Sequence, residues 1–132
     1  MEPDALKLED NFVPHWLVSG GLSQSVASVF WPQLRSPAGA SSRTLVPIGL
    51  DGFLSVIVNT PPSWQRGGMI VLLVHGLTGS ENSNHSVRLA DAFVRRGVLT
   101  VRMNMRNCGP GEGLAKGIYH SGRSEDTRAV LE

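Results

Sequence analysis

The feature that most constrains the fold is a six-residue apolar run, Met69–Val74, which ends abruptly in His75-Gly76 and a polar, glycine-containing loop. A run this short and this apolar is typical of a strand buried on both faces, as in a parallel sheet covered by helices. The loop after such a strand lies at its carboxyl end, where open α/β sheets bind their ligands. The sequence therefore predicts an α/β fold with a candidate site just after residue 74.

A hairpin is predicted before this run. Thr44–Ile48 and Phe53–Val58 are short strand candidates, and Asp51-Gly52 between them is a hairpin-type turn signal. Pro47 cannot donate a ladder hydrogen bond, so the first strand is expected at a sheet edge.

A βαβ unit is predicted after the run. Ser83 or Asn84 could cap a helix that ends at Gly97, and Val98–Met103 reads as the next strand. A further helix is predicted near the end of the chain, with Ser124 as its cap. The apolar stripe predicted for the first of these helices comprises Val87, Leu89, Ala90, Phe93 and Val94.

Residues 1–42 differ from the rest in their tryptophans, prolines and a Ser/Ala/Gly-rich end. We expect a wrapping segment that packs on a partial core formed by residues 43–132, with a short helix over Leu22–Phe30. An alternative is a lid or membrane-surface element. Because the segment lacks the basic face of an interfacial helix, only weak membrane contact is expected. The apolar face in question would comprise Phe12, Trp16, Leu17, Phe30 and Trp31.

Composition excludes several classes of function. Twelve basic residues face 11 acidic ones without a basic block, which gives no electrostatic case for nucleic acid. The single cysteine, Cys108, excludes an internal disulfide and fits a reducing compartment. The four histidines are scattered, so neither a metal site nor a cofactor is predicted. The sequence shows no signal peptide and no transmembrane run, and a cytoplasmic protein is the expectation.

The His-Gly turn is the strongest chemical candidate. Such a turn at a strand end can aim backbone N–H groups at a developing oxyanion. The backbone N–H of Leu77 is the predicted donor, supported by His75 and Gly76, with Thr78 and Gly79 completing the loop. The alternative is a turn that merely ends a strand.

Other candidates are weaker. Arg106 and Cys108 lie on a long glycine-rich loop near the predicted site, and Cys108 is interpreted as a packed thiol because no base adjoins it. His120 is interpreted as ordering its loop. Gly109–Gly113 fits neither the dinucleotide nor the P-loop pattern. Ser23 lacks the preceding strand and second glycine of a serine elbow.

Taken together, these motifs resemble the YheT-type branch of the α/β-hydrolases. Asn107 departs from the resemblance, since the family usually has glycine there, and Leu-Ser-Gln-Ser replaces the family's His-Leu-Gln-Thr. The stretches that carry the resemblance are Phe12–Leu17 with Gly20–Gln24, Asp51-Gly52, His75–Ser80, Asn104–Gly109, Tyr119–Gly122 and Glu125-Asp126.

The resemblance implies the N-terminal part of a serine ester hydrolase acting on acyl esters or lipid-like substrates. In the family the serine elbow and the rest of the triad come later, and this chain contains no Gly-x-Ser-x-Gly. We therefore expect a chain cut before the nucleophile strand and inactive alone. Met69–Val74 would be a bare edge open to self-association, making the isolated chain poorly soluble, oligomeric or partly unfolded. The alternatives are a non-catalytic truncated isoform or pseudoenzyme fragment acting at most as a binding module, and an unrelated small α/β binding module.

Overall fold

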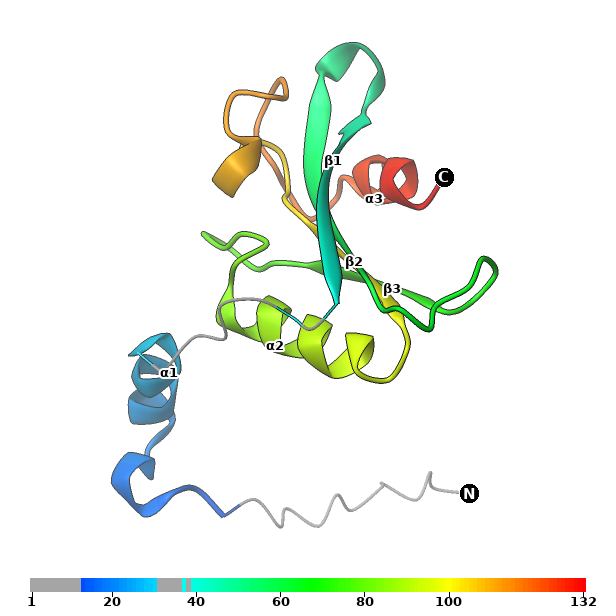
Figure 1. Cartoon of the computed structure of the whole chain (residues 1–132). Coiled ribbons are helices and arrows are strands. Elements are labelled where there is room, and N and C mark those ends of the chain that lie inside the picture. Colours follow the sequence, from blue (N-terminus) through cyan, green and yellow to red (C-terminus); the bar gives the residue numbers. More distant parts are fainter. Residues whose placement is uncertain (1–12, 31–36, 38) are drawn as a thin grey trace, which may run out of the picture. The chain divides into compact units, whose positions relative to one another are not determined.

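The computed structural model describes residues 13–30, 37 and 39–132, although not the side chains of 28–30 (Figure 1). The chain divides into two compact units, Met1–Pro32 and Gln33–Glu132, which we describe separately. The first contains the 3₁₀ turn η1 (Trp16–Val18) and helix α1 (Gly21–Phe30), which agrees with the predicted helix. Trp16 and Leu17 are exposed, whereas Phe12 and Trp31 of the predicted apolar face lie outside the described residues.

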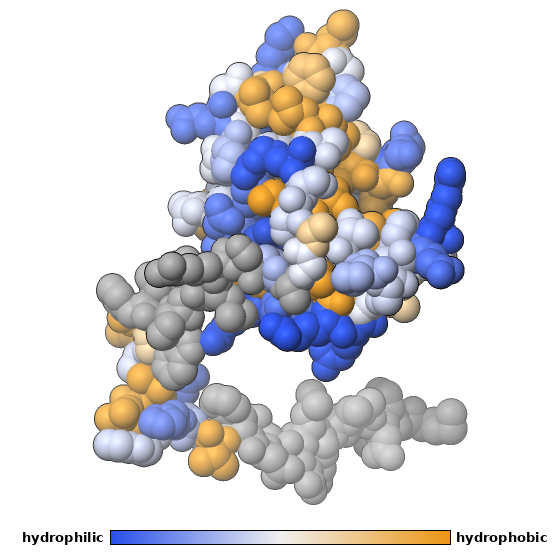
Figure 2. All heavy atoms as spheres, in the orientation of Figure 1, coloured by the Kyte–Doolittle hydropathy of each residue, from blue (hydrophilic) through white to orange (hydrophobic). Residues whose placement is uncertain are grey.

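The second unit is built on a four-stranded sheet of order β1-β2-β4-β3. β1 (Ala40–Pro47) and β2 (Phe53–Thr60) form the predicted antiparallel hairpin, joined by the short turn η2 (Gly49–Asp51). β1 lies at one edge of the sheet, which accommodates Pro47 as expected. Figure 2 shows apolar residues gathered at the end of the core unit where this hairpin turns, and Leu45, Leu50 and Phe53 are exposed there.

The predicted βαβ unit is present. β3 (Ile70–Val74) and β4 (Leu99–Met103) pair in parallel with Ile70 opposite Leu99, and α2 (Asn84–Val94) connects them. Gly97, at φ 78°, closes the helix in the left-handed region that favours glycine. The strand begins at Leu99, one residue later than predicted.

The apolar stripe of α2 is narrower than predicted. Val87, Ala90 and Val94 are buried as expected, but Leu89 is 45% exposed, so its assignment to the buried stripe was wrong. Leu89 lies at the border of the apolar stripe. The spacing of apolar residues in the sequence does not distinguish a buried position from a half-exposed one there.

β3 is less buried than its apolar sequence predicted. Ile70 is 51% and Val74 43% exposed, so the expectation of a strand buried on both faces was wrong. The physical reason is its position: among the described strands β3 pairs only with β4 and forms the second edge of the sheet. The buried core lies elsewhere, on one face of the two central strands, where alternate residues point the same way. Its members are Leu54, Val56, Leu99, Val101 and Met103.

The last element, α3 (Ser124–Leu131), contributes Val130 to the edge of this core. Its N-cap is Arg123, so Ser124 is the first helical residue rather than the cap. Asp126 in the first turn is buried, an unusual place for a carboxylate unless a partner neutralises it. Among the described residues no helix has the length and apolar character needed to cross a bilayer.

Candidate active site

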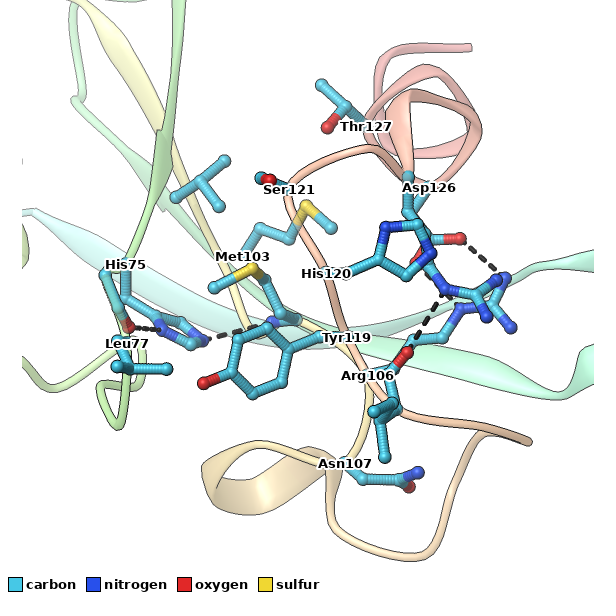
Figure 3. A pocket seen from close by; sticks show the side chains of 15 residues that line it. His75, Leu77, Met103, Arg106, Asn107, Tyr119, His120, Ser121, Asp126 and Thr127 are labelled. Carbon is cyan, nitrogen blue, oxygen red and sulfur yellow. Dashed lines mark hydrogen bonds and ion pairs between the residues drawn. The ribbon is translucent and has the colours of Figure 1, made fainter.

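A cavity of about 950 Å³ lies at the carboxyl ends of β3 and β4 (Figure 3). Its walls come from the end of β3, from the end of β4 and the residues after it, and from segment 118–127. Open α/β sheets place their ligands at this end of the strands. Much of the lining is apolar, through Val74, Leu77, Met103, Met105 and Ile118. The cavity is therefore suited to an apolar group flanked by a few polar atoms.

His75 anchors the turn after β3. Its Nε2 accepts a hydrogen bond of 3.1 Å from the backbone N–H of Met105, so the ring proton is assigned to Nδ1, which donates to the carbonyl oxygen of Gly76 over 2.8 Å. The side chain is buried and both nitrogens are engaged. This arrangement leaves His75 no free nitrogen for proton transfer and makes it a tie between the β3 turn and the segment after β4.

The turn itself is tight and strained. Thr78 has φ 59°, a left-handed conformation that is costly for a β-branched residue, and the N–H of Gly79 donates to the carbonyl of Gly76 over 3.0 Å. A Cβ on Gly79 would lie 2.8 Å from Ser83 Oγ, so the turn has no room for a side chain there. Strain of this kind clusters at functional sites.

Leu77 occupies the tip of this turn. It is 80% exposed and lines the cavity, and within the described part of the chain its backbone N–H makes no hydrogen bond. An N–H left open at a cavity wall is available to a ligand oxygen. Of the other loop residues predicted at the site, His75 and Gly76 line the cavity, whereas Thr78 and Gly79 do not.

Segment 118–123 forms the opposite wall. The hydroxyl of Tyr119 accepts a weak hydrogen bond of 3.4 Å from the backbone N–H of Thr78. The exposed His120 lines the cavity, and its Nδ1 accepts from the N–H of Gly122, which orders the local turn. Tyr119 was absent from the sequence-predicted site residues, although it belongs to the Tyr-His-Ser-Gly stretch that carries part of the family resemblance. Its place opposite Thr78, 41 residues away in the chain, is a tertiary feature.

Arg106 also lines the cavity, but its charge is already neutralised. Nε and Nη2 form a bidentate pair with Asp126 at 2.8 and 2.7 Å, and Nη1 contacts Asp51 at 2.7 Å and the carbonyl of Lys116 at 3.0 Å. Arg106 and Asp126 are both buried, which accounts for a carboxylate inside the first turn of α3. The pair raises the pKa of Arg106, and hydrogen bonding to Arg106 lowers the pKa of Asp51. Arg106 thus ties the turn between β1 and β2, the segment that carries Lys116 and the start of α3 together.

Asn107 occupies the position at which the resembling family usually has glycine. Its φ is 57°, the conformation that glycine adopts freely and asparagine tolerates. Its side chain also forms hydrogen bonds that glycine could not. Oδ1 accepts from the N–H groups of Gly113 and Ala115, and Nδ2 donates to the carbonyls of Ala115 and Gly117 at 2.8 and 2.7 Å. The asparagine therefore keeps the backbone shape and adds order to the loop.

Beneath the turn lies a buried polar network centred on Glu81. The Glu81 carboxylate accepts from Arg43, with one contact of 2.5 Å, and from Asn104. Asn104 Oδ1 in turn accepts from the backbone N–H of Glu81 over 2.9 Å, and Arg102 donates to the carbonyl of Glu81 over 2.7 Å. Buried charges persist when paired in this way. The network fixes the segment that leads from the turn into α2.

Cys108 does not belong to the cavity wall. Its side chain is buried and desolvation raises the pKa of the thiol, which opposes formation of a nucleophilic thiolate. No group of three or more His, Cys, Asp or Glu side chains in the described residues could hold a metal ion.

No family model matches the chain. A curated protein, "Putative esterase YheT" of Escherichia coli (strain K12), is 30% identical over 102 residues, which is 77% of this chain and 26% of that protein. The chain thus spans about a quarter of the length of this relative.

Two solved structures at 28% identity resemble this chain. An α/β serine hydrolase homologue from Coxiella burnetii has a TM-score of 0.55, with 68% of this chain and 43% of that chain covered. An α/β serine hydrolase without a lid from Xanthomonas campestris has a TM-score of 0.52, with 75% and 44% covered. This chain spans less than half of either structure.

Proposed function

The chain is a YheT-like α/β-hydrolase over part of its relatives' length, and from this premise we propose that it carries the oxyanion-binding turn of a serine ester hydrolase. The observation that carries the proposal is the open backbone N–H of Leu77 on the cavity wall. One donor of an oxyanion hole lies in this loop in α/β-hydrolases, and the second follows the nucleophile. The turn is held from below by His75 and Glu81, which favours a fixed direction for the donor.

The cavity supports an acyl ester, including a lipid-like ester, as the substrate class. Its apolar walls suit a hydrocarbon chain, and the methionines Met103 and Met105 can adapt to chains of different shape. No Gly-x-Ser-x-Gly is present in the 132 residues, so they supply charge stabilisation without an attacking group. We expect no labelling of this chain by a fluorophosphonate probe, and strong labelling would contradict this site assignment.

Butylphosphonate tests the oxyanion assignment directly, because its charged tetrahedral oxygens resemble the intermediate of ester hydrolysis and its butyl group the acyl chain. In ¹H–¹⁵N spectra of the chain, we expect the Leu77 amide to shift on titration, with roughly millimolar affinity. Leu77→Pro removes the N–H and should abolish binding, whereas the matched variant Leu77→Ala keeps the N–H and should bind within a few-fold of wild type. Equal binding by the proline variant would overturn the proposal.

A second candidate function is that of a binding module that pairs through β3. The observation that favours it is the position of β3 at the edge of the described sheet, with Ile70 and Val74 half-exposed. The strand carries no charge that would discourage pairing with a second copy. A chain that pairs in this way forms oligomers in light scattering, and Ile70→Lys should reduce their mass. A monodisperse wild-type monomer with a sharp two-state melt would contradict this function.

A further inference from the structure

Tyr119 occupies a position that the proposed function leaves unexplained. Its side chain is partly buried on the cavity wall, and Figure 3 shows the ring reaching from segment 118–123 toward the turn that carries His75 and Leu77. The phenol oxygen accepts from the N–H of Thr78, the residue after Leu77, over 3.4 Å. The hydroxyl group therefore contacts the residue that directly follows Leu77.

The direction of the phenol proton follows from this contact. A hydroxyl oxygen that accepts a hydrogen bond from one amide must direct its own O–H away from that donor. In the described part of the chain nothing accepts the O–H of Tyr119. The phenol O–H is thus available to an acceptor in the cavity, whose wall both Tyr119 and Leu77 line.

We propose that Tyr119 donates a hydrogen bond to the same acyl oxygen as the Leu77 amide, so that this chain contributes two donors to the oxyanion site. This inference rests on the proposed function and adds a catalytic side chain to it. The alternative is that Tyr119 only supports the strained Thr78. A hydrogen bond from Tyr119 to a charged acyl oxygen is stronger than its contact with the Thr78 amide, because hydrogen bonds to ions are about twice as strong as those between neutral groups.

Tyr119 is the only tyrosine of the chain, which makes the test specific. The chain is labelled with ¹³C at tyrosine Cζ and with ¹⁵N, and titrated with butylphosphonate. We expect the Tyr119 Cζ and the Leu77 amide to shift with the same dissociation constant. Tyr119→Phe should weaken binding roughly tenfold, the effect of losing one hydrogen bond to an ion. Asn82→Ala, an exposed change on the same loop outside the cavity, should bind like wild type.

The outcomes separate the role of Tyr119 from that of the oxyanion turn. If Leu77 shifts while Tyr119 Cζ does not, the role of Tyr119 is overturned and the oxyanion turn stands. A Tyr119→Phe variant that moves the free-state Thr78 amide yet binds as tightly as wild type overturns that role as well, since it shows support of Thr78 alone. If neither group shifts, the proposed function fails. The Cζ measurement uses wild-type protein, so poor folding of the variant cannot obscure the result.

Discussion

The loops after β3 and β4 lie at the same end of the sheet but are stabilised in opposite ways. In the loop after β4 the polar side chains bind other parts of the protein. Arg106 and Asn107 form hydrogen bonds that hold the neighbouring segments in place. The loop after β3 is held at its two ends, by His75 and Glu81, and left open at its tip, Leu77. The loop after β4 is therefore braced by its own side chains, whereas the loop after β3 leaves a backbone donor open at its tip.

Arg106→Met should have the largest effect on the loop after β4. The variant leaves Asp126 as a buried carboxylate without its partner, and breaking such a pair costs about 3–5 kcal/mol. We expect this loss in the free energy of unfolding in urea, followed by tryptophan fluorescence. Arg95→Met is the matched control, since the Arg95 side chain is 67% exposed where it pairs with Asp91, and its loss should cost less than about 1 kcal/mol. Equal losses would refute the assignment of Arg106 as a buried tie.

Glu81→Gln tests the anchor of the other loop. Glutamine replaces one acceptor oxygen with a donor nitrogen that would face Arg43 or Asn104, both of which are donors. We expect a loss of about 2–3 kcal/mol in the urea unfolding free energy, in the range for hydrogen bonds to charged groups. Faster amide hydrogen exchange at Leu77 and Thr78 should accompany it. Glu125→Gln, at an exposed and loosely paired position, should change neither measurement, and a similar effect there would argue against a special role for Glu81.

Periodicity and turn chemistry were sufficient to predict the scaffold. The hairpin at Asp51-Gly52 and the parallel β3–α2–β4 unit follow from local patterns that the structure retains. The predicted burial of Leu89 was wrong, because the spacing of apolar residues does not show how wide a stripe of the helix is buried.

The supports of the site could not be predicted, because they depend on distant partners. Glu81 and Arg43 meet across 38 residues, and Tyr119 and Thr78 across 41. Polar residues at such separations carry no periodic signal, since only the assembled sheet brings them together. The open edge of β3 depends likewise on which strands are its neighbours, which its own apolar letters do not reveal.

Asn107 gives a smaller and more graded test of the loop after β4. Asn107→Ala loses the side-chain hydrogen bonds and places a less tolerant residue at φ 57°, so we expect a loss of roughly 2 kcal/mol in unfolding free energy. Asn107→Gly loses the same bonds but keeps the backbone conformation, and should cost about half as much. The ordering of the two variants is the result to measure. A glycine variant less stable than the alanine variant would show that backbone conformation is not what limits this position.

The smallest effect on the free energy of unfolding is expected in the loop after β3, where the substitution should stabilise the protein. Thr78 is exposed and left-handed, a conformation that costs a β-branched residue about 1–2 kcal/mol. Thr78→Gly removes that cost and keeps the backbone N–H that meets Tyr119, while the extra freedom of glycine in the unfolded chain offsets about 0.5–1 kcal/mol. We therefore expect the variant to be more stable by roughly 0.5–1 kcal/mol in urea. Butylphosphonate should nevertheless bind more weakly, because a glycine turn fixes the direction of the Leu77 amide less firmly. A variant that is less stable than wild type, or that binds more tightly, would show that strain at Thr78 does not hold the donor in place.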